Sequence, residues 1–232
     1  SDTMLILTDS RVPAAARKKL SEYGQVIDFA SQGITYAGVS GHVDLFFCPT
    51  PQTLIVAPNV PGEYINLLEK HHIAHAFGVR EVGSNYPETA FYNALVTDEL
   101  IVMNSKVSEP LIQKAAIGKT QIVVKQGYIR CNLLELPGGS FITSDRGIER
   151  ALKQHKKEVL FVNPAPIILP GFEHGFFGGA CGLLANQLFI CGSLNYFTEQ
   201  SDIVVFTEKA GVQIVELYDG PPCDIGTKLF IV

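Results

Sequence analysis

The residue with the clearest chemical potential is Cys223, in the segment G-P-P-C-D near the C-terminal end of the sequence. A cysteine thiolate can attack an electrophilic carbon and form a covalent intermediate, which water or an acceptor amine then releases. That role requires a lowered thiol pKa, produced by a nearby histidine or a cationic substrate. A free cysteine is equally often a small buried hydrophobic side chain, so the segment alone leaves both interpretations open.

His174 is the first candidate for proton transfer. It lies in the segment L-P-G-F-E-H-G-F-F-G-G-A-C-G, whose many glycines indicate tight backbone packing or a ligand close to the main chain. As a general acid and base, His174 would protonate a leaving amine and later activate water. A hydrogen-bonded histidine in a turn is the other interpretation, and His42 is the second choice for the catalytic role.

Asp44 is the candidate for holding a positive charge. It precedes the apolar residues L-F-F, where a lone carboxylate is costly unless it is paired. We expect Asp44 either to bind a cationic group of the substrate or to cap or pair with the chain nearby.

The elements that must position these residues form a repeat. Four stretches of the chain read strand, strand, helix, strand, and residues 223–232 repeat the two strands as a fifth hairpin. When the five hairpins are aligned, one residue of each falls in the same column. Successive residues of this column are about 45 residues apart in the sequence, a period typical of propellers and arrays. The column contains Asp44, Asn93, Asn132, Gly182 and Asp224.

The two ends of the chain are predicted to complete one ring. A single unit cannot bury both faces of its small sheet, whereas five units around an axis share a core. Residues 1–30 supply the helix and strand that the fifth hairpin lacks, and they contain no phosphate-binding G-x-G-x-x-G. We therefore predict one α/β domain over residues 1–232, a five-bladed propeller of ββαβ modules closed by its N- and C-terminal segments.

This arrangement resembles the pentein, or guanidino-group-modifying, superfamily of arginine deiminases, dimethylarginine hydrolases, amidinotransferases and agmatine deiminases. Besides the module order, the similarity lies in G-P-P-C-D at 220–224, G-H-V-D at 41–44, the His174 segment and S-D-R-G at 144–147. It implies a cysteine-dependent hydrolase or transferase acting on a guanidine or amidine C–N bond of a small cationic substrate. Cys223 would be the nucleophile, His174 the acid and base, and Asp44 the cation-binding residue.

The sequence departs from the pentein pattern at two points. Where the superfamily carries G-G-D in the third module, this chain has Arg130, Cys131 and Asn132, and His174 is not part of an H-x-D. Asn93 and Asn132 could line the central cavity through amide hydrogen bonds, or serve only as turn residues. A pentein-like binding or scaffold protein without turnover, as in the ribosome anti-association factor of this fold, is the alternative function.

A second alternative is a thiol metal site. Cys131, Cys181 and Cys223 share the column that precedes the Asp/Asn column, and neighbouring residues of a strand face opposite ways. If the cysteine column faces the axis, three thiols converge and could bind a soft metal. The other interpretation is three buried core thiols.

Composition narrows the class of partner. The sequence has 18 basic and 23 acidic residues, a net charge of -5, which gives no electrostatic footprint for nucleic acid. It has no apolar run of about 20 residues and no basic, apolar leader, so we expect a soluble cytoplasmic protein that does not bind membranes.

Five cysteines without C-x-x-C spacing favour free thiols. The expected partner is a small-molecule substrate, and no cofactor is expected.

Overall fold

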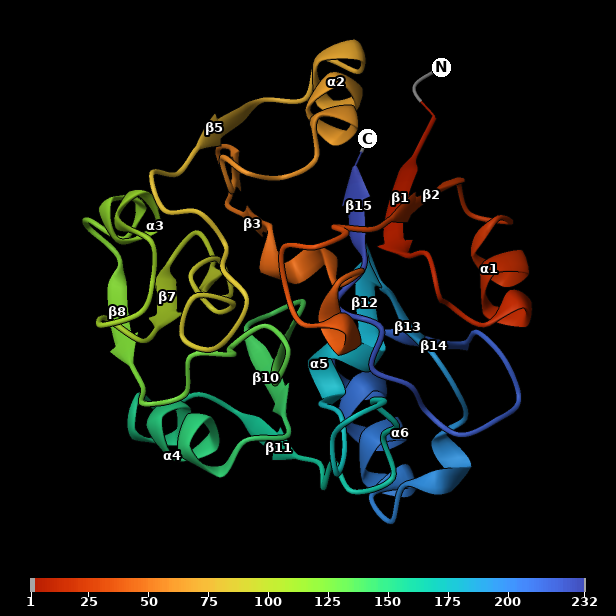
Figure 1. Ribbon diagram of the computed structural model, residues 1–232. Coiled ribbons are helices and arrows are strands. Elements are labelled where there is room, and N and C mark those ends of the chain that lie inside the picture. The colour runs from red at the N-terminus through yellow and green to blue at the C-terminus, as the bar shows by residue number, and fades with distance from the viewer. Residues whose placement is uncertain (1–2, 232) are drawn as a thin grey trace.

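The computed structural model of the chain describes residues 3–231 and contains five three-stranded sheets arranged around a common centre (Figure 1). Four of these sheets follow one another along the chain, each with its strands in sequence order. They are β3 (Phe47–Pro49), β4 (Leu54–Val56) and β5 (His75–Phe77); β6 (Leu95–Val96), β7 (Leu100–Met103) and β8 (Thr120–Val123); β9 (Leu133–Leu136), β10 (Ser140–Thr143) and β11 (Val159–Phe161); and β12 (Cys181–Leu184), β13 (Gln187–Ile190) and β14 (Gln213–Glu216).

In each of these four sheets the first two strands are antiparallel and the third is parallel to the second. A parallel pair needs a crossover, and one helix supplies it in every module. These helices are α2 (Gly62–Lys70), α3 (Pro110–Ala115), α4 (Arg146–Gln154) and α6 (Gln200–Lys209), with the short α5 (Phe177–Ala180) preceding β12. The order strand, strand, helix, strand predicted for four stretches is therefore confirmed.

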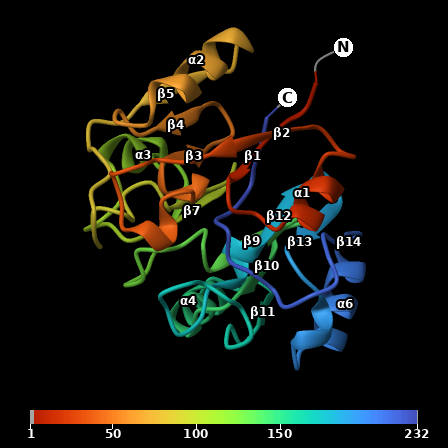
Figure 2. The same cartoon turned by 45° about the vertical axis from the view of Figure 1, so that its right-hand side comes forward.

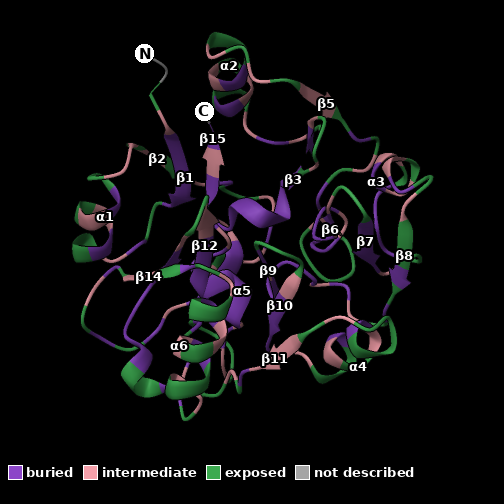
Figure 3. Cartoon of the chain, turned by 180° about the vertical axis from the view of Figure 1, so that it is seen from behind, coloured by how far each residue is buried: buried purple, intermediate pink, exposed green. Residues whose placement is uncertain are grey.

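The crossover helices form because each has one apolar face and a defined start. In α4 the side chain of Asp145 accepts a hydrogen bond from the Ile148 amide (2.8 Å) and caps the first turn, while Ile148 and Leu152 are buried. The outer faces of the crossover helices are exposed, whereas the strands near the centre are buried (Figure 3). The helices thus surround the centre and leave it to the strand ends and loops.

The fifth sheet is built from both ends of the chain. It contains β15 (Leu229–Ile231), β1 (Leu5–Asp9) and β2 (Gln25–Phe29), with α1 (Ala14–Leu20) between β1 and β2. β1 pairs antiparallel with β15 and parallel with β2, so this sheet has the same order as the other four (Figures 1 and 2). The predicted use of residues 1–30 to complete the last module is confirmed at the level of strand pairing.

The prediction of a two-stranded hairpin within residues 223–232 is wrong. Residues 223–226 form no strand beyond an isolated parallel bridge between Cys223 and Ile168, and Val232 lies outside the described residues. β15 instead pairs with β1, which is buried along its whole length and therefore suits the central position of a sheet. The tail supplies one strand, and the N-terminus supplies the second.

Hydrogen bonds link the modules near the centre. Asp44 lies in the 3₁₀ turn η2 (Val43–Leu45), which precedes β3. The side-chain amide of Asn93 donates a hydrogen bond to the backbone carbonyl of Asp44 (2.9 Å). The backbone amide of Arg130 donates to the backbone carbonyl of Asn93 (2.9 Å). The first, second and third modules are therefore joined through buried polar groups.

The same chain of hydrogen bonds continues to its starting point. The Gly179 amide donates to the Cys131 carbonyl (2.9 Å), and the Ile225 amide donates to the Gly179 carbonyl (3.3 Å). Thr227 then donates from both its amide (3.1 Å) and its hydroxyl (3.0 Å) to Oδ2 of Asp44. We call this set of contacts the central circuit, because it begins and ends at Asp44.

Apolar packing fills the space behind the circuit. One buried cluster joins the terminal sheet to the first three modules through residues such as Leu5, Phe47, Ile101 and Phe141. Two smaller clusters complete the fourth module and the contact between that module and α1. Among residues 3–231 no helix has both the length and the apolar character needed to cross a membrane.

Replacing Thr227 by valine tests the central circuit. The change keeps the shape but removes the hydroxyl that donates to Asp44 and to the Gly178 carbonyl (3.1 Å). We expect urea unfolding to show a loss of about 1–3 kcal/mol, because a buried carboxylate loses a donor. The matched control, Thr198→Val at an exposed site, should stay within about 0.5 kcal/mol. Equal losses in the two variants would contradict a structural role for the circuit.

Candidate active site

Cys223 is held in a partly exposed position by its backbone. Its amide donates to the Cys191 carbonyl (2.8 Å), and its neighbours bind the backbone of Ile168 on the other side. The Cys223 sulfur lies 3.0 Å from the Tyr218 hydroxyl. A hydrogen bond from the Cys191 thiol lowers the pKa of Cys223 to about 6; partial burial opposes this shift and the Tyr218 hydroxyl supports it. The contacts with Cys191 and Tyr218 therefore favour the thiolate form of Cys223.

The other cysteines are buried and differ from Cys223 in acidity. Burial raises the pKa of Cys48 and Cys181, the latter to about 12, and raises that of Cys131 well above its ordinary value. Within residues 3–231 no three His, Cys, Asp or Glu side chains are grouped to hold a metal ion. The convergence of Cys131, Cys181 and Cys223 that a thiol metal site requires is thus not found.

Two cavities lie beside the centre of the fold. The first, here the nucleophile chamber, has a volume of about 140 Å³ and is lined by Cys223, Asp9, Arg11, His42 and Asp224, among others. The second, here the aromatic chamber, has a volume of about 130 Å³. Both chambers are lined by His42, Asp224 and Leu169, so these residues form the boundary between them.

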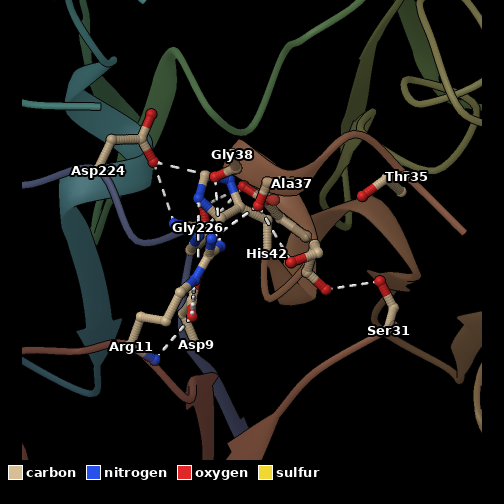
Figure 4. A network of polar contacts seen from close by, with 12 residues as sticks. Asp9, Arg11, Ser31, Thr35, Ala37, Gly38, His42, Asp224 and Gly226 are labelled. Atoms are coloured by element: carbon tan, nitrogen blue, oxygen red, sulfur yellow. Dashed lines mark hydrogen bonds and ion pairs between the residues drawn. The ribbon is translucent and has the colours of Figure 1, made fainter. Parts of the chain in front are cut away.

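The His42 ring lies between two carboxylates. Its Nε2 is 3.9 Å from Asp9 and its Nδ1 is 4.0 Å from Asp224, and the ring is almost completely buried (Figure 4). Gly226, with φ +73°, packs against His42, and a side chain there would meet the Cα of His42 at 2.8 Å. The second-choice histidine of the sequence is therefore the one that shares a cavity with Cys223.

Asp9 is fixed by Arg11. Nε (3.0 Å) and Nη2 (2.8 Å) of Arg11 donate to the two carboxylate oxygens of Asp9, and Nη1 donates to the Ala37 carbonyl (2.7 Å). A bidentate pair of this kind holds both side chains in one orientation. No local pattern in the sequence predicts a site role for either residue, because the N-terminal segment meets the tail of the chain through the pairing of β1 with β15.

Asp224 is a buried carboxylate that binds backbone amides. It accepts hydrogen bonds from Phe176 (3.0 Å) and Gly226 (3.0 Å), and burial raises its pKa while His42 opposes the shift. A side chain at Gly175 or Gly179 would overlap Asp224. The glycine-rich segment therefore packs its backbone against this carboxylate, one of the two interpretations that its composition allowed. Asp224 belongs to the predicted column but was not predicted as a site residue.

Asp44 pairs locally. Its Oδ2 accepts hydrogen bonds from the Cys131 thiol (3.2 Å) and from Thr227, whereas its buried Oδ1 has no partner among the described residues. Asp44 lines neither chamber and lies behind Cys131, which lines the aromatic chamber. Of the two predicted roles, the structure thus shows the local pairing.

Three further predicted residues lie outside both chambers, as Asp44 does. Asn93 binds the Asp44 carbonyl and the Cys131 amide, and Asn132 binds the Tyr128 carbonyl (2.8 Å) and the Ser144 hydroxyl (2.9 Å). Nδ1 of His174 is 2.8 Å from the Gly175 carbonyl, and its ring packs edge-on against Phe176. Both asparagine amides are bound by protein groups, and the His174 ring contacts its own segment.

The lowered pKa of Cys223 predicts the pH dependence of its alkylation. Only the thiolate reacts, so the rate of labelling by iodoacetamide should reach half its maximum near pH 6 rather than near pH 8.5. Tyr218→Phe removes a donor and should raise this midpoint, whereas Tyr86→Phe at an exposed site should not. Peptide mass spectrometry assigns the label. A wild-type midpoint near pH 8.5 would contradict the assignment.

The close packing of Gly179 against Asp224 predicts a stability effect. Gly179→Ala should lower the free energy of unfolding by about 1–3 kcal/mol, because the added methyl group overlaps a buried carboxylate. Gly62→Ala is the control, since Gly62 is exposed at the start of α2 with open space around it, and should be neutral within about 0.5 kcal/mol. Urea unfolding of both variants measures the difference, and a neutral Gly179→Ala would count against the packing.

Comparison with solved structures identifies the fold. DDAH from Pseudomonas aeruginosa, a cysteine-to-serine mutant complexed with citrulline, is similar over 93% of this chain and 92% of its own, with a TM-score of 0.53 and 7% identity. SxtG, an amidinotransferase from Microseira wollei in the saxitoxin biosynthetic pathway, is similar over 93% of this chain and 88% of its own, with a TM-score of 0.51 and 11% identity. Both are penteins, so the resemblance seen in the sequence is confirmed for the fold.

Comparison by sequence gives the family. No curated protein matches the chain. A family model described as a family of unknown function, DUF6873, matches residues 7–229, which include nearly all described elements and every candidate residue of the site. The chain therefore belongs to the DUF6873 family and has the pentein fold.

Proposed function

We propose that the protein is a cysteine-dependent hydrolase or amidinotransferase that acts on a guanidine or amidine C–N bond of a small cationic substrate. The observation that carries the proposal is the nucleophile chamber, where Cys223, with its lowered pKa, shares one cavity with His42 and two buried carboxylates. The pentein fold, shared with an amidinotransferase and with DDAH complexed with citrulline, supports it. In this proposal the five modules form a closed ring with the site at its axis.

The reaction begins with attack by the Cys223 thiolate on the central carbon of the bound cation. A C–S bond forms as the electron pair of the C=N bond moves to nitrogen. Asp224 lines both chambers and provides negative charge beside the cation, and Asp44 adds its charge from behind Cys131. A cation in a water-poor cavity interacts strongly with these carboxylates, which orients its carbon toward the sulfur.

Breakdown of the adduct requires a proton. The C–N bond to the leaving amine breaks as His42, in its imidazolium form, gives the amine a proton, and an S-linked thiouronium remains on Cys223. Water then gives a proton to His42 and its oxygen attacks the same carbon. The new hydroxyl loses its proton to solvent as the C=O bond of the product forms, so that the C–S bond breaks and the thiolate is restored. With an acceptor amine in place of water, the same steps transfer the amidino group.

Variants of the two histidines test the assignment of the acid and base. His42→Asn should lower kcat by about 10²–10⁴-fold, the usual contribution of general acid and base catalysis, whereas His174→Asn should stay within about threefold. Cys223→Ser should abolish turnover of small guanidines and labelling by chloroacetamidine. Loss of activity in His174→Asn with normal activity in His42→Asn would contradict the role of His42. It would assign the acid and base to His174, the histidine implied by the pentein resemblance.

The alternative of a binding protein without turnover has one observation in its favour. Asn132 stands where penteins carry a carboxylate, and its amide is fully engaged by Tyr128 and Ser144. In that case a substrate analogue would protect Cys223 from labelling although no guanidine, amidine or acceptor amine gives product.

A further inference from the structure

The aromatic chamber is lined mainly by apolar side chains. Seven of its ten lining residues are aromatic or aliphatic, and the aromatic ones are Tyr36, Tyr128, Phe172 and Phe176. The rings of Tyr36 and Phe172 pack together with their centroids 5.4 Å apart. The other three lining residues are His42, Asp224 and Cys131, and the first two are shared with the nucleophile chamber.

Within residues 3–231, Arg11 is the one lysine or arginine that lines either chamber, and His42 lines both. The nucleophile chamber contains Arg11, but this guanidinium already binds both oxygens of Asp9 and the backbone carbonyls of Ala37 and Gly38. Both ring nitrogens of His42 already face Asp9 and Asp224. A carboxylate on a ligand would therefore lose its hydration close to Asp9 and Asp224 and compete with them for Arg11 and His42. Desolvation and like-charge repulsion both oppose such binding.

The chambers are small. At about 30 Å³ for each water molecule in the liquid, 140 and 130 Å³ each correspond to roughly four waters. A guanidinium group has four heavy atoms and matches one chamber. A tail of about four heavy atoms matches the other.

We propose that the substrate is a small guanidine or amidine with a short apolar tail and no carboxylate, its cationic head in the nucleophile chamber and its tail in the aromatic chamber. This inference rests on the proposed function for the reacting group. It adds that the aromatic side chains select the tail and that the buried carboxylates reject amino-acid substrates. Burial of an alkyl tail against aromatic faces is favourable, and the cationic head gains from the adjoining carboxylates.

A pair of ligands that differ in one group tests the inference. Butylguanidine and 4-guanidinobutyrate share a guanidinium and a four-carbon chain, but only the second has a carboxylate. We expect butylguanidine to have at least a 100-fold higher kcat/KM, and to protect Cys223 from iodoacetamide at a concentration at least 100-fold lower. Arginine should behave like 4-guanidinobutyrate.

The two readouts separate this inference from the proposed function. Protection of Cys223 by butylguanidine without turnover would overturn the proposed function but support the selection of an apolar cation. Equal or better turnover or protection with 4-guanidinobutyrate or arginine would overturn the inference and leave the reaction in place. If none of these ligands protects Cys223, the inference is overturned as well.

Phe172 provides a test of the tail site. It is 47% exposed, so Phe172→Ala should fold normally, and we expect it to lower kcat/KM and protection for butylguanidine about tenfold while changing those for methylguanidine less than twofold. Phe77→Ala is the matched control, because Phe77 is 44% exposed on β5 and lines neither chamber. An equal loss of kcat/KM and protection for both guanidines would show that Phe172 does not select the tail, and would overturn this part of the inference.

Discussion

The buried Asp44 carboxylate is the interaction on which the centre of this molecule depends. Its oxygen Oδ2 accepts hydrogen bonds from Thr227 near one end of the chain and from the Cys131 thiol in the third module. Its backbone carbonyl accepts from Asn93 in the second module. A buried carboxylate is costly without donors, so folding must bring these segments together to satisfy it. Closing the central circuit and forming the site are therefore the same structural event.

Space at the centre is limited, and this explains the glycines. Gly41 faces Asp9, and Gly175 and Gly179 face Asp224, so that the backbone itself approaches each carboxylate. Asp224 obtains its donors from backbone amides in this way, and a side chain at any of these positions would displace it. The Asp224 carboxylate is consequently held by main-chain amides, an arrangement that suits a preorganised charge distribution.

The chemistry proposed for the site follows from differences in burial between similar groups. Cys131 and Cys223 are both cysteines near the centre, but Cys131 is buried beside a carboxylate, and burial first and then Asp44 raise the pKa of its thiol. Cys223 is partly exposed and lies beside two hydrogen-bond donors, the Cys191 thiol and the Tyr218 hydroxyl, which stabilise its thiolate. One environment favours a structural thiol and the other a nucleophile. The same contrast separates His42, enclosed between carboxylates, from His174, whose ring packs on its own segment.

The sequence by itself determined most of the elements and singled out Cys223 as the candidate nucleophile. Four ββαβ stretches follow from alternating apolar residues, turn residues and helix starts, all of which are local, and the period between them predicted five modules. The sequence could not determine that the tail supplies one strand, because the pairing partner of β15 is β1, more than 200 residues away. Only the tertiary structure decided that His42, Asp9 and Asp224 meet Cys223, whereas His174, Asn93 and Asn132 do not enter its cavity. Strand pairing and the orientation of loops from distant modules decide which side chains share a cavity. Neither leaves a local pattern in the sequence.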